Sequence, residues 1–280
     1  MEAAVSHREE RPFKRIAPSR GLSLGLAELW RFRELVWFLT LRDVQVRYKQ
    51  TLFGAGWAIL QPLLQTIIFT FFFGRLANIP SDGIPYPIFS FAALLPWSYF
   101  SQTVVLASQS LVGNAQLLRK VYFPRLAIPL AGVLAGLVDL SIASVVLVLF
   151  MAYYDVGLTS RVILAPLFVL VVVITALGAS LWLSALNVRY RDVKHVVPFL
   201  VQFWLFATPV IYPSSMLPER FHIVYAINPM VGAIEGLRWS LLGTAPPNSI
   251  FIASSAVAIA LMWSGAVFFR VSERAFADIV

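Results

Sequence analysis

Two segments of this sequence repeat aromatic rings and side-chain amides at helical spacing. Residues three, four or seven apart lie on one face of an α-helix, so each set predicts a single stripe. Rings stack on the C–H faces of sugars, and amides exchange hydrogen bonds with hydroxyl groups. The stripes therefore suggest a path for a carbohydrate chain, although phenylalanines that pack or face lipid would look the same. They are Trp57, Gln61, Gln65 and Phe72, and Phe199, Gln202, Phe203 and Phe206.

Residues typical of catalysis are missing from the sequence. It has no Gly-x4-Gly-Lys-Ser/Thr phosphate loop, so we do not expect this chain to hydrolyse ATP itself. It has no cysteine, and its three histidines are scattered, so neither a disulfide nor a metal site is predicted. We therefore expect a protein that is not an enzyme and that holds no cofactor of its own.

Asp139 is the one ionisable residue deep inside a long apolar stretch. A charge at the centre of a membrane helix costs on the order of 3 kcal/mol on insertion scales, which calls for a specific role. A proton relay would need further partners. We expect Asp139 either to hydrogen-bond across helices or to lie near water.

Six long apolar stretches must position these residues. A helix needs roughly 20 apolar residues to cross about 30 Å of hydrocarbon. The composition is 59% hydrophobic and 13% charged, and the apolar runs are continuous rather than alternating, which favours helices over strands. The stretches are approximately 52–73, 87–107, 128–153, 162–188, 196–212 and 250–271.

Lysine and arginine concentrate in every second gap between these stretches. Thirteen lie between residue 21 and the first stretch or after the second, fourth and sixth, whereas four lie in the remaining gaps. By the positive-inside rule this predicts an all-α integral membrane protein with six transmembrane helices and both termini in the cytoplasm. Attraction to anionic lipid explains the net charge of +8 without nucleic acid.

The chain divides into three predicted regions. Residues 1–20 are charged and polar, so we expect a disordered cytoplasmic tail rather than a cleaved leader. Residues 22–50 form an interface and gate helix region. Within it, residues 22–43 mix aromatic residues with arginines, which suits a helix in the membrane interface with Trp30, Phe32, Trp37 and Phe38 toward lipid. An amphipathic helix against a soluble partner is the alternative. Residues 51–280 form the transmembrane domain.

Two gaps have distinctive sequences. In the second cytoplasmic gap, Asn114 can cap a short helix that Pro124 would end, with Arg119 and Lys120 in its last turns. Such a helix offers a docking surface for a cytoplasmic protein, unless the gap is a plain basic turn. The outer gap 213–248 is proline-rich yet apolar, which predicts two short helices that dip back toward the membrane, with Glu235 and Arg238 facing each other on the second.

Five segments carry a resemblance to a known family. Residues 41–63 (LRDVQVRYKQTLFGAGWAILQPL) resemble the entry segment of type-2 ABC-transporter permeases that export polysaccharides such as O-antigen, capsule and teichoic acid. The resemblance continues through residues 118–125, 186–193, 207–213 and 227–230, from about residue 35 to the C-terminus.

The resemblance implies a homodimer of this chain with two copies of a separate ATPase that binds ATP and Mg²⁺. It implies ATP-driven export of a lipid-linked polysaccharide across the bacterial cytoplasmic (inner) membrane. Arg42, Arg47 and Lys49 would form a gate helix region that meets the lipid diphosphate, and the outer helix pair would be re-entrant and close the outer mouth. The coupling helix on the ATPase would be Gln116, Leu117, Leu118, Arg119, Lys120, Val121, Tyr122 and Phe123.

Three other functions compete with this interpretation. An ABC exporter of a drug or small lipid would share the scaffold. A membrane glycosyltransferase acting on a polyprenyl-linked sugar should carry acidic residues in a large outer loop, but the outer gaps hold only Asp82, Asp155, Glu219 and Glu235. A proton-coupled transporter would want several intramembrane carboxylates and an internal repeat. The motifs do not separate one glycan from another.

Overall fold

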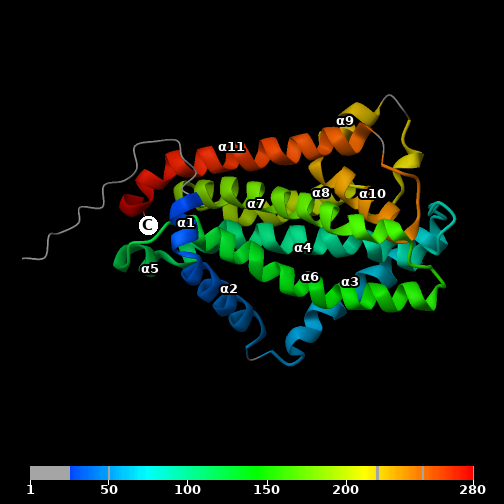
Figure 1. The fold of residues 1–280 in the computed structure, drawn as a ribbon, viewed down its shortest axis with the longest axis horizontal. Coiled ribbons are helices and arrows are strands. Elements are labelled where there is room, and N and C mark those ends of the chain that lie inside the picture. The colour runs from blue at the N-terminus through cyan, green and yellow to red at the C-terminus, as the bar shows by residue number, and fades with distance from the viewer. Residues whose placement is uncertain (1–25, 50, 219–220, 248, 280) are drawn as a thin grey trace, which may run out of the picture.

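The computed structural model describes residues 26–49, 51–218, 221–247 and 249–279. Every regular element in these ranges is a helix, as the continuous apolar runs predicted (Figure 1). The long helix α4 (Tyr86–Gly113) lies at the centre and packs on α6 (Ala127–Tyr153) and α7 (Ala165–Arg189), and α7 packs on α11 (Ser249–Ile279). The predicted tail 1–20 lies outside the described residues.

Among the described residues, five helical segments are long and apolar enough to cross a membrane. They are Gly54–Leu76, Tyr86–Gly113, Ala127–Tyr153, Ser160–Arg189 and Ser249–Glu273. The first consists of the short turn η1 (Gly54–Gly56), α3 (Trp57–Phe69) and the π-helical η2 (Thr70–Leu76), and the fourth begins with the turn η3 (Ser160–Leu164). The sixth predicted crossing, residues 196–212, contains a shorter helix, α8 (Val193–Phe206), whose 14 residues extend about 21 Å.

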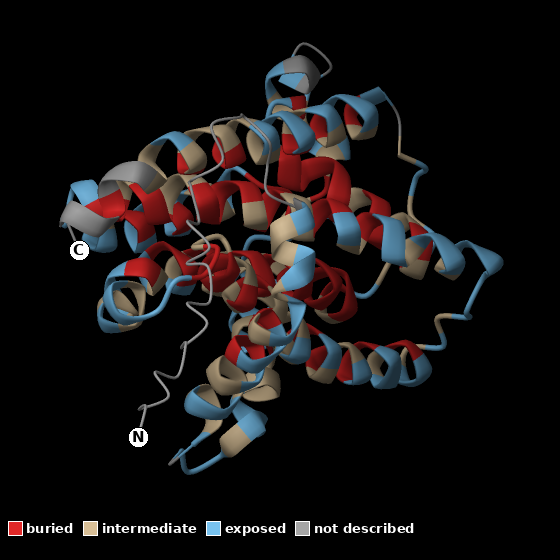
Figure 2. Cartoon of the chain, turned by 60° about the vertical axis from the view of Figure 1, so that its left-hand side comes forward, coloured by how far each residue is buried: buried red, intermediate tan, exposed pale blue. Residues whose placement is uncertain are grey.

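Close backbone contact explains the largest helix interface, between α7 and α11. A Cβ atom added at Gly178 would lie 2.7 Å from the backbone nitrogen of Met262, and one added at Gly265 would lie 2.6 Å from the carbonyl oxygen of Gly178. Lipid-embedded helices gain no hydrophobic drive from meeting each other, so small residues stabilise the pair by letting backbones approach. Figure 2 shows the buried residues gathered in the interior of the bundle, and α4, α7 and α10 contribute many of them.

The predicted N-terminal helical region is two helices, α1 (Leu26–Arg31) and α2 (Arg33–Tyr48), which separate at Phe32. In Figure 1, α2 runs obliquely along the outside of the bundle, where it packs on α6. Its aromatic side chains point away from the protein, with Trp37 63% and Phe38 65% exposed. Both interpretations of this region, lipid interface and soluble partner, require such an exposed face.

The short helix in the second cytoplasmic gap is present as α5 (Ala115–Lys120), with Arg119 and Lys120 in its last turn as predicted. Two details of the prediction were wrong. Asn114 occupies the N-cap position but makes no capping bond, because its Oδ1 accepts from Arg42 (2.9 Å) while its Nδ2 donates to the carbonyl oxygen of Ser110 (2.7 Å). The helix also ends before Pro124, since the backbone is already extended at Val121.

Two helices follow the short turn η4 (Ser214–Met216), as the broken apolar pattern predicted. They are α9 (His222–Ala226) and α10 (Pro229–Leu242). Asn228 caps α10 by accepting from the backbone N–H of Met230, and Gly243 ends it with φ of 75°, a left-handed conformation that glycine adopts without strain. Most of α10 is buried against α4, α7 and α11, so its backbone is covered by protein.

Candidate functional site: two ends of the bundle and the face between them

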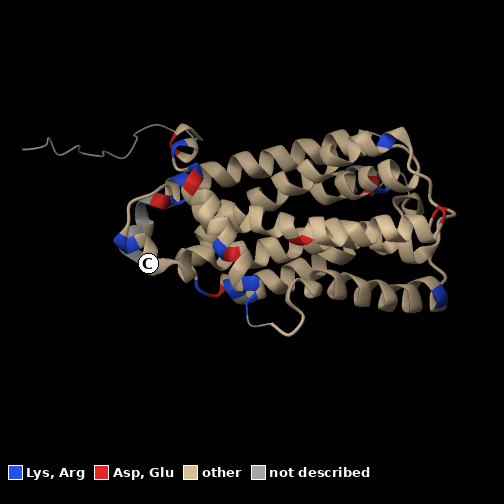
Figure 3. Ribbon diagram, turned by 60° about the horizontal axis from the view of Figure 1, so that its bottom comes forward, with Lys and Arg blue, Asp and Glu red and all other residues tan. Residues whose placement is uncertain are grey.

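One end of the bundle carries α1, α5, the start of α6 and the last turns of α11, and we call it the basic end. Most lysine and arginine residues of the described ranges lie near it (Figure 3). The segment after α5 joins its parts: the Tyr122 hydroxyl donates to Glu28 Oε1 of α1 (3.3 Å), and Arg125 donates to the backbone carbonyl of Glu273 in α11. Partial burial and the Glu28 carboxylate raise the pKa of Tyr122.

The predicted coupling residues divide into an exposed set and an anchor. Phe123 is 5% exposed and packs with Ile128 at the start of α6. Leu117 and Leu118 lie partly buried against the same cluster. The side chains of Gln116, Arg119, Lys120, Val121 and Tyr122 are exposed. The arrangement is a short basic surface fixed to the bundle by apolar residues.

Arg42 links α2 to the start of α5. Its Nη1 donates to Asn114 Oδ1 (2.9 Å), and its Nη2 donates to Asp43 (2.7 Å). Nothing in the spacing of Arg42 and Asn114 along the sequence indicated this contact, since they are 72 positions apart.

Asp139 forms hydrogen bonds across helices, which is the first of the two roles expected for it. Its carboxylate accepts from the Arg47 guanidinium and from the Tyr48 hydroxyl at the end of α2. Burial lowers the pKa of Arg47, an effect that the nearby Asp43 carboxylate opposes. The pairing of Arg47 with Asp139 was not predicted from the sequence. Two facts could have predicted it: a carboxylate inside a span needs a cationic partner, and Arg47 lies shortly before the first span.

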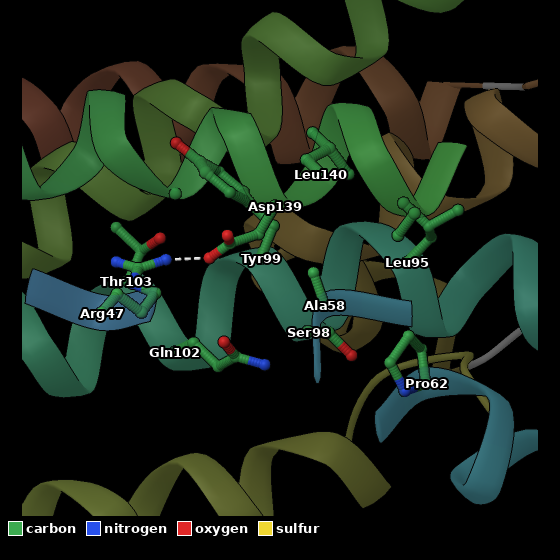
Figure 4. Close-up of a pocket in the computed structure, with 12 residues that line it drawn as sticks. Arg47, Ala58, Pro62, Leu95, Ser98, Tyr99, Gln102, Thr103, Asp139 and Leu140 are labelled. Carbon is green, nitrogen blue, oxygen red and sulfur yellow. Dashed lines mark hydrogen bonds and ion pairs between the residues drawn. The ribbon is translucent and has the colours of Figure 1, made fainter. Parts of the chain in front are cut away.

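A small cleft lies beside this ion pair, between α2, α3, α4 and α6 (Figure 4). Its free volume is about 20 Å³, which is room for about one water molecule. Among its lining residues, Ser98, Gln102 and Thr103 of α4 are polar. Lys49, the third predicted gate residue, follows α2 and is exposed.

The two aromatic and amide stripes are largely exposed, but this chain does not bring them face to face. Trp57 of α3 is 45% and Phe72 of η2 is 52% exposed, and Phe203 of α8 is 61% exposed. Gln61, Phe199, Gln202 and Phe206 are exposed as well, whereas Gln65 is partly buried. Both helices pack on α4: Gln102 of α4 donates to Gln61 Oε1 (3.3 Å), and the ring of Phe100 of α4 meets Trp204 of α8 edge to face. The stripes therefore flank α4.

At the opposite end, two segments that carried the family resemblance meet at Asn228. The Asn228 Oδ1 accepts from the Trp204 indole (3.0 Å), and its Nδ2 donates to the Ala207 carbonyl oxygen (3.0 Å) and to Thr208 Oγ1 (2.9 Å). With the bond from the Met230 N–H that caps α10, both the oxygen and the nitrogen of the Asn228 amide are fully hydrogen-bonded. The end of α8 is thereby fixed to the start of α10.

Arg238 of α10 lies buried beside this junction, a role that the sequence analysis missed. Its guanidinium donates to the carbonyl oxygens of Phe89 (3.2 Å), Pro209 (2.6 Å) and Val210 (2.8 Å), and its Cζ lies 3.5 Å from the centre of the Phe89 ring. The sequence did contain an indication of this role: Arg238 is a lone arginine within an apolar helix, and a buried charge requires hydrogen-bond partners.

Long apolar helices around a buried central helix, with a basic end, define an integral membrane protein. Within the described residues, no group of three potential metal ligands occurs. Comparison with known proteins gives the family: residues 34–242 match the ABC-2 type transporter family, and the chain belongs to it.

Its relatives include proteins of polysaccharide export. The O-antigen export system permease protein RfbA of Myxococcus xanthus is 31% identical over 259 residues, which cover 90% of this chain and 98% of the relative. RfbA of Klebsiella pneumoniae is 33% identical, over 74% of this chain and 78% of the relative. The polysialic acid transport protein KpsM of Escherichia coli is 22% identical, over 70% and 77%.

Proposed function

We propose that this chain is the permease subunit of an ABC exporter that moves a lipid-linked, O-antigen-type polysaccharide across the bacterial cytoplasmic membrane. The observation that carries the proposal is the similarity to RfbA of Myxococcus xanthus along nearly the whole length of both proteins. Three of the relatives are named for O-antigen export and two for polysialic acid transport, which favours a polysaccharide over a drug or a small lipid as the cargo.

In this proposal the chain crosses the membrane six times, with both termini in the cytoplasm. The fifth crossing combines α8 with residues 207–212, whose backbone continues past the end of the helix. Thr208, Val210 and Ile211 are buried, and Asn228 and Arg238 satisfy the carbonyl groups of that segment. Non-helical backbone at membrane depth is tolerated where protein covers it, which makes a 14-residue helix sufficient.

The basic end then faces the cytoplasm, where a separate subunit binds ATP and Mg²⁺. We assign the contact with that subunit to residues 116–123, the exposed basic surface that Phe123 anchors. Because Arg42 bonds to Asn114 beside this surface, ATP-driven movement of α5 would reach α2. The helix pair α9 and α10 would close the outer mouth.

A second copy of the chain would complete the conduit. Only 11% of the first candidate span is buried within one chain, against 78% of the second, so α3 is the most weakly covered of the crossing helices. The exposed stripes of α3 and α8 flank α4, and a symmetric partner would place a second pair of stripes opposite them. The glycan would pass between these rings and amides.

At the cytoplasmic entrance, Arg42, Arg47 and Lys49 would meet the lipid diphosphate, since phosphates favour guanidinium and ammonium donors. The three residues differ in whether they are already paired with a carboxylate. Arg42 and Arg47 are already paired with Asp43 and Asp139, whereas the side chain of Lys49 is exposed. Lys49 would therefore meet the phosphates first.

Purification of this chain with its ABC ATP-binding subunit, followed by ATPase assays in nanodiscs, tests the proposal. We expect the two subunits to purify together and hydrolyse ATP. Charge reversal at Lys120, in the last turn of α5, should weaken the complex or uncouple hydrolysis from export. The matched control is Arg75→Glu, which reverses an exposed charge at the end of the first span that lies away from the basic end. A chain that purifies without any ATPase would contradict the proposal, as would equal effects of the two reversals.

A further inference from the structure

The second half of α2 is held to the bundle mainly by polar contacts. The buried residues of α2 are Val36, Leu39 and Thr40, all in its first half. Toward its end Val46 is 67% exposed, and Leu52 in the following connection is 91% exposed. Apolar packing therefore fixes the start of the helix, while its last turns depend on the bonds from Arg47 and Tyr48 to Asp139.

Asp139 is well placed to control those turns. It is the only charged residue in α6 and lies about 18 Å along the helix from its first residue. The Arg47 and Asp139 side chains are 20% and 14% exposed, so little water competes for either partner. Removing one partner of such a pair leaves the other charge buried and uncompensated, which strongly disfavours the closed arrangement.

Polar side chains lie behind this ion pair, and one of them has no hydrogen-bond partner. The Thr103 Oγ1 is buried and has no hydrogen-bond partner, and Ser98 and Gln102 line the same cleft (Figure 4). Gly136 keeps the cleft open on the α6 side, because a Cβ atom there would lie 2.5 Å from Thr103 Oγ1. The end of α2 covers hydroxyl and amide groups that could hydrogen-bond a polar ligand.

We propose that Asp139 is a positioning residue that latches the end of α2 over this cleft, and that a phosphate headgroup releases the latch by taking Arg47 from Asp139. The second part rests on the proposed function, in which Arg47 meets a lipid phosphate. A phosphate and a carboxylate compete for the same face of a guanidinium, so Arg47 stays paired in both states. The Tyr48 hydroxyl bonds Asp139 in the closed state. When the end of α2 lifts, the hydroxyl groups of the cleft replace Tyr48 as hydrogen-bond donors to Asp139.

Thiol labelling measures the latch directly, because the chain contains no cysteine and Ser98→Cys creates a single target in the cleft. In maltoside micelles, which contain no phosphate, we expect Asp139→Asn to increase the labelling rate by a water-soluble maleimide roughly tenfold, the change that a difference of 1.4 kcal/mol in closing free energy produces. Arg47→Gln should have a similar effect. Added polyprenyl phosphate should accelerate labelling of the chain with Asp139 intact, and the uncharged polyprenol should not.

A second cysteine position separates opening of the latch from unfolding. Ser254 is fully buried in α11, so Ser254→Cys should stay unlabelled in the same backgrounds unless the bundle itself unfolds. Equal labelling of Ser98→Cys with and without Asp139→Asn would overturn the latch. Equal effects of polyprenyl phosphate and polyprenol would overturn the exchange at Arg47. Neither result depends on the ATPase, whose association with the chain is measured separately.

Discussion

Replacing Arg238 with alanine removes three charge-assisted hydrogen bonds from the interior of the protein. The carbonyl oxygens of Phe89, Pro209 and Val210 would lose their donor, and two of them belong to the non-helical segment after α8. A hydrogen bond to a charged group contributes about 1.5–3 kcal/mol, so the gross loss is on the order of 4.5–9 kcal/mol. Alanine avoids the cost of burying a guanidinium, and the expected net destabilisation is about 3–5 kcal/mol.

Thermal denaturation of the chain in nanodiscs measures this effect. The readout is the loss of the monodisperse peak in size-exclusion chromatography as the temperature rises. For a protein of this size the loss corresponds to a decrease in Tm of roughly 6–20 °C. Arg238→Lys should lose about half as much, because its three donors sit on one nitrogen and reach fewer of the three carbonyls.

The control for Arg238 is Arg161→Ala, which removes a surface arginine whose Cζ lies 5.5 Å from the centre of the Trp239 ring in the same region. Its expected cost is below about 1 kcal/mol. If Arg238→Ala were no less stable than this control, the carbonyl groups would be satisfied by other partners, and the role of Arg238 in fixing α10 to α4 would be refuted.

Three further substitutions test the fold and the conduit. Gly178→Ala should destabilise the chain by about 1–3 kcal/mol because its Cβ would collide with the α11 backbone, whereas Gly113→Ala, which meets open space, should change the Tm little. Asn228→Asp should also lower the Tm, by the equivalent of about 1–3 kcal/mol, since it turns an amide donor toward the Ala207 carbonyl into an acceptor. Phe203→Ala should reduce glycan export at an unchanged Tm, because this ring is exposed in one chain, and normal export would argue against a conduit along α8.

The sequence predicted the apolar helices well because their signal is local. Each crossing segment must bury its backbone hydrogen bonds within itself, so its length and composition alone reveal it. The first four and the last predicted stretches coincide with the candidate spans to within several residues. The fifth differs because α8 stops at Phe206, and the following segment is stabilised by Asn228 and Arg238 instead of by helical bonds.

Side-chain partners were harder to predict than helices. Asn114 has the residue type and position of a helix cap, yet its amide bonds to Ser110 and Arg42, because α2 passes close to the start of α5. Phe32 interrupts a region that reads as one helix, and no single residue near it is a helix breaker. Such outcomes depend on which surfaces meet, and a single sequence does not contain that information locally.

The sequence by itself determined that the chain is a helical membrane protein, where its helices lie approximately, and which gaps are basic, because hydrophobic length and charge are sums over neighbouring residues. Tertiary structure alone decided the pairing of Arg47 with Asp139, the three carbonyl partners of Arg238 and the placement of both aromatic stripes beside α4. Those contacts join residues far apart in the chain. Their formation depends on the close approach of helix backbones and on the need of each buried charge for a partner.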